Sequence, residues 1–183
     1  MNKLSRSLYR LSSGPVTLAA LVVFILFMVF VLPDQARKAE SVSGGAGSPD
    51  TSYFYSSADL ERMAEAYGEE GRAAYVVARF TFDLVFPIAY LAFLVTAIGW
   101  LLNKALPDPE NKWRLLNLFP IFGAFFDYCE NIAASVFMMR YPEPAALAGF
   151  LAPVFTLIKW FFVNGSFIVL FIAGLLALSK MRR

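Results

Sequence analysis

The sequence predicts an all-α membrane protein, a four-transmembrane-helix bundle with a short amphipathic extracytoplasmic helix between spans 1 and 2. The chain is 58% hydrophobic and 16% charged, whereas a soluble domain is roughly 45 to 50% apolar and about 25% charged. Its apolar residues fall in four long blocks, each close to the roughly 20 helical residues that cross a bilayer. We therefore expect a single membrane domain, 1–183, without a separate soluble catalytic domain.

The four predicted spans are about 15–33, 80–102, 115–139 and 153–178. The first follows three bases and resembles a signal peptide. Its apolar run of about 18 residues exceeds the 7 to 15 of a secretory core, which favours a retained anchor. The fourth apolar block is too long for one perpendicular span. Pro144 and Pro153 therefore predict an interfacial segment before a span that starts at Pro153, because proline suits a first helical turn.

Lysine and arginine predict the orientation, since both are enriched in cytoplasmic loops. The amino-terminal tail, the segment between spans 2 and 3 and the carboxyl-terminal tail are all basic. The segment 34–79 instead holds eight acids against five bases. We therefore expect both termini in the cytoplasm, residues 34–79 outside, and the protein in the cell (inner or plasma) membrane.

The extracytoplasmic segment 34–79 is predicted to contain a linker followed by helix. Residues 35–52 are rich in glycine, serine and charge, which is typical of a flexible linker. Ser56 and Asp59 form a capping box ahead of a short amphipathic helix that ends at Gly68. After Gly68 the helical pattern continues, and we expect that helix to run without a break into span 2.

Ionisable and amide side chains inside the spans mark the candidate site. An ionised group facing lipid costs roughly 2.5 to 3.5 kcal/mol, so these residues should face inward and pair with one another. Helical spacing places the polar residues of span 3 on or near one face of that helix, and Asp83 and Tyr90 on one face of span 2. The candidate ligand- or ion-binding residues are Asp83, Tyr90, Asp127, Glu130, Asn131 and Lys159.

Three arginines are predicted at the rim of this site, toward the outer leaflet: Arg72, Arg79 and Arg140. Arg79 lies one helical turn before Asp83, so the two can pair. The pair is either an anchoring salt bridge at the interface or the rim of an outward-opening cavity that attracts an anionic headgroup or solute. Span 1 contributes nothing polar beyond Thr17 and is predicted to be a scaffold, which leaves spans 2, 3 and 4 to build the site.

Charge in the predicted site is unbalanced, because three acids face one lysine. Either Asp127 stays protonated through desolvation, or a cation or cationic ligand completes the balance. Asp127 and Glu130 could share a hard cation such as magnesium. No other cofactor or metal is expected, since the chain has no histidine and a single cysteine, Cys129. A net charge of +2 is too small to indicate a nucleic-acid partner.

Three functions fit these residues. The first is binding or translocation of a small solute, a proton or a lipid, because buried acids beside lysine and tyrosine are typical of transport pathways. Four spans are few for a carrier, which favours a homodimer or a larger membrane complex. The second is an accessory or assembly subunit whose polar groups lock helices together. The third is an intramembrane lipid-modifying enzyme that uses the carboxylates. No catalytic residue can be named, and the absence of histidine argues against an enzyme.

Overall fold

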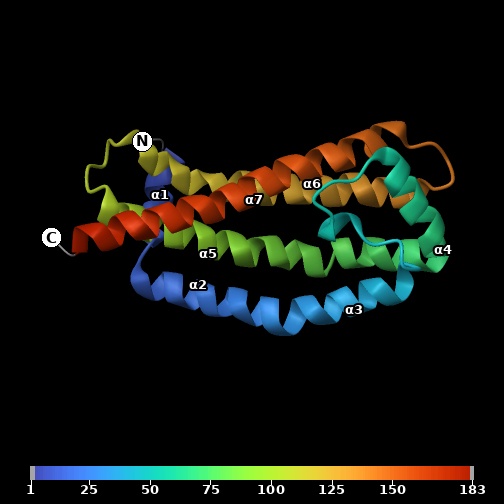
Figure 1. The fold of residues 1–183 in the computed structure, drawn as a ribbon, viewed down its shortest axis with the longest axis horizontal. Coiled ribbons are helices and arrows are strands. Elements are labelled where there is room, and N and C mark those ends of the chain that lie inside the picture. The colour runs from blue at the N-terminus through green and yellow to red at the C-terminus, as the bar shows by residue number, and fades with distance from the viewer. Residues whose placement is uncertain (1–2, 182–183) are drawn as a thin grey trace.

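Long helices packed side by side make up the fold (Figure 1). The computed structural model describes residues 3–181, and within that range every regular element is a helix and none is a strand. The protein is therefore all-α, as the sequence predicts. Helix α1 (Lys3–Leu11) and the carboxyl-terminal end of α7 (Ala146–Met181) lie at one end of the molecule, called here the terminal end. Helix α4 (Ser57–Arg79) lies at the opposite end, called the loop end.

The first long segment is a continuous helical rod that covers residues 14–42. It consists of α2 (Gly14–Leu26), the π-helical turn η1 (Phe27–Val31) and α3 (Leu32–Val42). The wider π-turn accommodates Pro33, which has no N–H to donate to the preceding turn. The predicted flexible linker is thus wrong for residues 35–42, because good helix formers and a 2.7 Å ion pair between Lys38 and Asp34 extend the helix. The linker begins at Ser43 and contains only the short 3-10 turn η2 (Pro49–Thr51).

Helix α4 begins at the predicted capping box. The Asp59 N–H donates to the Ser56 hydroxyl, and the Ser56 N–H donates back to the Asp59 carboxylate. Gly68 bends α4 with a φ of 61°, in the left-handed region that glycine adopts without strain. The predicted unbroken helix into span 2 is wrong, because α4 ends at Arg79 and α5 starts at Phe82. The Thr81 hydroxyl donates to the carbonyl of Val77 and closes the last turn of α4.

The remaining long helices are α5 (Phe82–Ala105), α6 (Phe119–Arg140) and α7, with the 3-10 helix η3 (Lys112–Leu118) leading into α6. Pro153 lies inside α7, one helix of 36 residues, so the predicted first helical turn at Pro153 is wrong. The interfacial segment before Pro153 stays a prediction. Helices α6 and α7 approach closely at Gly123, where a Cβ atom would lie 3.0 Å from Val163. This close approach lies between the two helices that carry the central charges.

Within the part of the chain that the structure describes, three helical segments are long and apolar enough to cross a membrane: 14–42, 57–105 and 146–180. Helix α6 is not among them, because the polar run DYCEN lowers its mean hydropathy. The outward faces of the helices are nevertheless apolar on α6 as elsewhere, with Phe30, Phe125 and Phe171 more than half exposed. Such a continuous apolar exterior is compatible with membrane insertion, since soluble proteins rarely expose large apolar patches.

Candidate functional site

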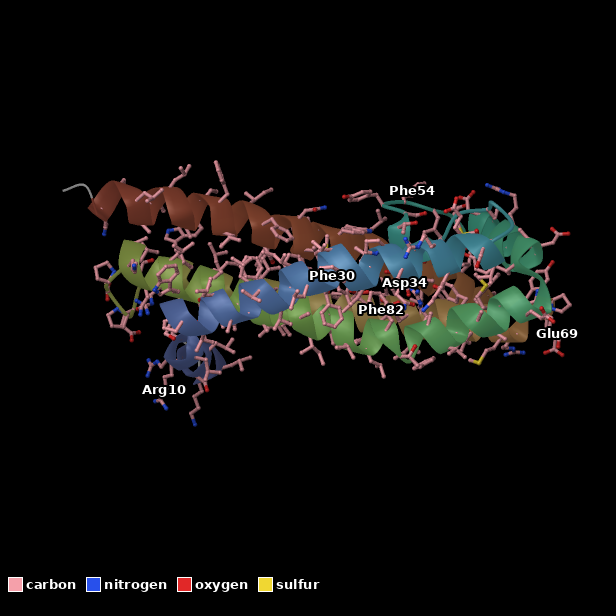
Figure 2. The ribbon with its side chains drawn as sticks, turned by 90° about the horizontal axis from the view of Figure 1, so that it is seen from below. Arg10, Phe30, Asp34, Phe54, Glu69 and Phe82 are labelled. Carbon is pink, nitrogen blue, oxygen red and sulfur yellow. The ribbon has the colours of Figure 1, made fainter. Side chains whose placement is uncertain are left out.

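A cavity of about 700 Å³ lies between the α2–α3 rod and the bundle of α5, α6 and α7. Figure 2 shows the rod crossing over α5 near Phe82, and Phe27 of the rod lies 6.5 Å from Phe82 between ring centroids. The cavity thus has the rod as one wall, contrary to the prediction that span 1 is only a scaffold. The linker 43–53 covers its loop end.

One part of the cavity wall is apolar. Phe24 and Met28 of the rod face Phe86 on α5 and Phe167 on α7. The rings here are packed together: Phe82 and Phe86 stack with centroids 5.5 Å apart, and Phe24 stacks on Phe93 at 5.4 Å. These side chains form a wall that can bury hydrocarbon or ring surface of a ligand.

The other part of the wall carries two ionic clusters, and the first is centred on Arg79. Its guanidinium pairs with Asp50 from the linker and lies 2.6 Å from Asp83 on α5. The ring of Tyr75 packs against the same guanidinium, with a centroid distance of 4.7 Å. Arg79 is only 7% exposed, so this arginine belongs to the interior and not to the rim as predicted. The linker aspartate reaches it because the chain folds back over α4.

The second cluster is centred on Lys159 of α7, which is 4% exposed. Its ammonium pairs with Glu130 and lies 3.7 Å from Asp127, both on α6. The Tyr90 hydroxyl on α5 donates a 2.9 Å hydrogen bond to Asp127. Four of the six predicted site residues are thus in mutual contact, because the i, i+3 spacing of the two acids turns both toward one lysine.

A hydrogen-bonded layer lies behind Lys159, away from the cavity. Glu130 is fully buried and accepts a 2.6 Å hydrogen bond from the Thr156 hydroxyl and a 3.4 Å bond from the Tyr55 hydroxyl. Burial, with the nearby Glu130 carboxylate, raises the pKa of Tyr55 well above its usual value, so the hydroxyl stays protonated and continues to donate. Glu130 therefore holds Lys159 in place and does not itself line the cavity.

The cavity opening carries an aromatic pair. Tyr53 of the linker lies against Trp160 with ring centroids 4.5 Å apart, and both line the cavity. The Trp160 indole N–H donates a 3.0 Å hydrogen bond to the Ser52 carbonyl, which ties the linker to α7. Lys159 also lies 5.2 Å from the Trp160 ring. The linker is thus an ordered part of the site.

The other three predicted residues lie outside the cavity wall. Arg72 donates to the Ala64 carbonyl across the Gly68 bend and packs on Tyr141, because the bend turns it away. Arg140 is exposed and lies 3.6 Å from Glu143 in its own turn. Asn131 is buried and makes no side-chain hydrogen bond to the described residues.

Two residues that bond to the ionic clusters were not predicted from the sequence, namely Asp50 and Tyr55. Both lie in or beside the segment predicted to be flexible, and neither shows a periodic pattern. The sequence near Arg79 gave no signal for Asp50, because Asp83 one turn away already balances the charge of Arg79.

The cavity can contact an apolar group on its aromatic wall and a polar group on its charged wall at the same time. No group of three or more His, Cys, Asp or Glu residues within 3–181 is arranged to hold a metal ion. The hard cation proposed between Asp127 and Glu130 stays a prediction, and it would have to displace the Lys159 ammonium that both carboxylates face.

No match emerges when the chain is compared with protein-family models, with curated proteins and with solved structures. The functional conclusion therefore rests on the geometry of the cavity and its charges.

Proposed function

We propose that the protein is a four-span membrane protein that binds a small amphipathic molecule, such as a lipid, in the cavity beside the α2–α3 rod. The observation that carries this proposal is the division of one cavity into an apolar wall and a charged wall. Its volume of about 700 Å³ lies within the roughly 300 to 1,000 Å³ of ordinary ligand sites. A molecule with both a hydrocarbon part and a polar part would satisfy both walls.

The fourth span in this proposal is α6. Glu130 and Asn131 are buried and Asp127 contacts Lys159 in the bundle, whereas the apolar residues Phe122, Phe125 and Ile132 are exposed. A helix of 22 residues is about 33 Å long, enough for a hydrocarbon core of about 30 Å. Inward-facing acids paired with lysine are the arrangement in which a bilayer tolerates ionisable groups.

Bases at the terminal end support an orientation with both termini in the cytoplasm. Four exposed bases lie in α1, in the last turn of α5 or in η3: Arg6, Arg10, Lys104 and Lys112. Such bases are retained on the cytoplasmic side. The cavity, at the loop end, would then open to the outer half of the cell (inner or plasma) membrane. A lipid of the outer leaflet could reach it along the α2–α3 rod.

Native mass spectrometry of the protein released from mild detergent tests the proposal. We expect a retained small molecule or lipid on the unaltered protein, and the same spectra report whether it is a homodimer. Ala39→Trp places an indole into the cavity wall and should abolish retention. Ala19→Trp, on the exposed face of α2 outside the cavity wall, is the matched control. Equal retention by both variants would place the ligand elsewhere and contradict the proposal.

Translocation of the ligand is a second candidate, favoured by the position of Lys159 between two carboxylates. Movement of the ammonium from Glu130 toward Asp127 would change the charge that the cavity presents, which is a two-state element of the kind that carriers need. Reconstituted vesicles should then release a trapped ligand faster than vesicles with Lys159→Arg. Binding without any release would leave a receptor or accessory role as the function.

A further inference from the structure

We infer that the ligand of this cavity carries a positive charge, as a lipophilic ammonium or phosphonium does. The inference rests on the proposed function and specifies the class of ligand. Its basis is that every cation of the cavity wall is already held by two carboxylates. The wall therefore presents more negative than positive charge to whatever enters.

The two ionic clusters have the same composition. Arg79 is shared by Asp50 and Asp83, and Lys159 is shared by Asp127 and Glu130. Each cluster thus has two acids for one base. Three of the four acids line the cavity themselves, so the excess charge is directed at the cavity and not hidden behind it.

An anionic ligand would fit this wall poorly. A phosphate or carboxylate would have to displace Asp50 or Asp83 from Arg79, or both acids from Lys159, and leave the displaced carboxylates in the same cavity. Glu40 of α3 adds a further acid to the wall. Like charges that share one cavity of low dielectric constant repel each other by several kcal/mol. The wall therefore selects against anions.

Aromatic rings complete a site for a lipophilic cation. Tyr53 and Trp160 form a tilted ring pair in the cavity wall, and Phe86 contacts Tyr90 edge to face at 5.8 Å beside Asp127. Ring faces attract cations through their quadrupole. The apolar wall accepts the organic substituents, and the acids together with the rings accept the charge.

Tetraphenylphosphonium and tetraphenylborate provide the test, because the two ions share a shape and differ in the sign of charge. Equilibrium binding of each radiolabelled ion is measured on the whole protein in phosphatidylcholine nanodiscs, with empty nanodiscs subtracted. We expect specific binding of the phosphonium and none of the borate. Ala39→Trp should remove the specific phosphonium binding, and phosphonium binding unchanged in that variant would overturn the assignment to this cavity.

Charge-neutral variants make the test specific. Asp50→Asn and Asp127→Asn each leave the local cation one carboxylate partner, and each should weaken phosphonium binding about tenfold or more. Asp108→Asn, in the exposed connection at the terminal end, is the matched control and should leave binding unchanged. Using two separate acids guards against one variant that fails to fold.

The possible outcomes separate this inference from the proposed function. Borate binding as tight as phosphonium binding, sensitive to Ala39→Trp, would overturn the charge assignment and keep the cavity as a ligand site. Specific binding of neither ion would overturn the inference, and the proposed function would then be decided by the retention of a small molecule in native mass spectra. Phosphonium binding that none of the aspartate variants weakens would also overturn the inference, since the acids would then not be what attracts the ligand.

Discussion

Buried polar groups occupy both ends of the molecule, but only the loop end surrounds open volume with excess charge. At the terminal end, the Ser5 hydroxyl donates to the Asn117 side chain at 2.8 Å, and Arg114 donates to the Leu106 carbonyl and to Asn103 at 2.8 and 2.7 Å. These acceptors are neutral dipoles around one cation, and they join α1, α5 and η3. At the loop end four carboxylates share two cations beside a cavity. Polar burial alone therefore does not mark a ligand site, and the unbalanced charge beside empty space is what supports the proposed one.

The sharpest test of this comparison is Lys159→Met. It removes the one cation between Asp127 and Glu130 and strands both buried carboxylates, so we expect a loss of about 3 to 5 kcal/mol in the free energy of unfolding. Reversible unfolding in mixed micelles measures it. Adding Glu130→Gln to Lys159→Met should recover part of the loss.

The matched control is Lys104→Met, in which an exposed ammonium over the Trp100 ring is lost. Its effect should stay below about 1 kcal/mol. Suppose that Lys159→Met lowered the free energy of unfolding no more than this control. The stability of the two carboxylates would then not depend on the lysine, and the proposed difference in charge between the two ends would be contradicted.

A second prediction concerns Arg114→Met, which removes the buried guanidinium at the terminal end. Its two hydrogen bonds and its contact with the Tyr9 ring, 4.2 Å from the guanidinium, would be lost. We expect about 2 to 3 kcal/mol of destabilisation with no change in phosphonium binding. Lys112→Met, two residues earlier and exposed, should change neither quantity. A parallel loss of ligand binding in Arg114→Met would show that the two ends are coupled.

The sequence predicted the central contacts of the loop end for a physical reason. Helical periodicity is local, so the shared faces of Asp127 with Glu130, and of Arg79 with Asp83, follow from spacing alone. The cost of charge in hydrocarbon then requires the face of Asp127 and Glu130 to meet Lys159. The same reasoning predicted the all-α fold and the capping box at Ser56.

The parts that could not be predicted depend on long-range folding. Asp50 reaches Arg79 only because the linker returns across the loop end, and no local pattern in SGGAGSPD encodes that path. The cavity wall made by the α2–α3 rod is likewise invisible in an apolar sequence, since apolar side chains suit lipid and a ligand equally well. Helix α1 was overlooked because its bases were considered only as an orientation signal.

A third prediction changes the contact between Gly71 of α4 and the end of α3, the helix whose residues 35–40 line part of the cavity. A Cβ atom there would lie 2.6 Å from the Val42 carbonyl oxygen at the end of α3, so Gly71→Ala must push the two helices apart. We expect about 1 to 2 kcal/mol of destabilisation and weaker ligand retention in native mass spectra. Gly174→Ala, whose Cβ would meet nothing closer than 3.9 Å, is the control and should be neutral or stabilising. Retained ligand in Gly71→Ala would show that α3 is not an essential wall.

The smallest expected effect comes from Tyr9→Phe at the terminal end. The Tyr9 hydroxyl donates a 2.8 Å hydrogen bond to the Arg114 carbonyl, and its loss should cost about 1 kcal/mol at neutral pH. Burial raises the pKa of Tyr9 from 10.0 to about 12, so the folded protein holds the phenolic proton more tightly than the unfolded chain. The contribution of Tyr9 is therefore complete below pH 10 and is lost as the pH rises toward 12. The stability difference between the unaltered protein and Tyr9→Phe should shrink over that interval, and comparing the two proteins cancels the titration of the other tyrosines. A difference that stays constant with pH would mean that water reaches the hydroxyl, and the terminal end would then be less tightly closed than its hydrogen bonds indicate.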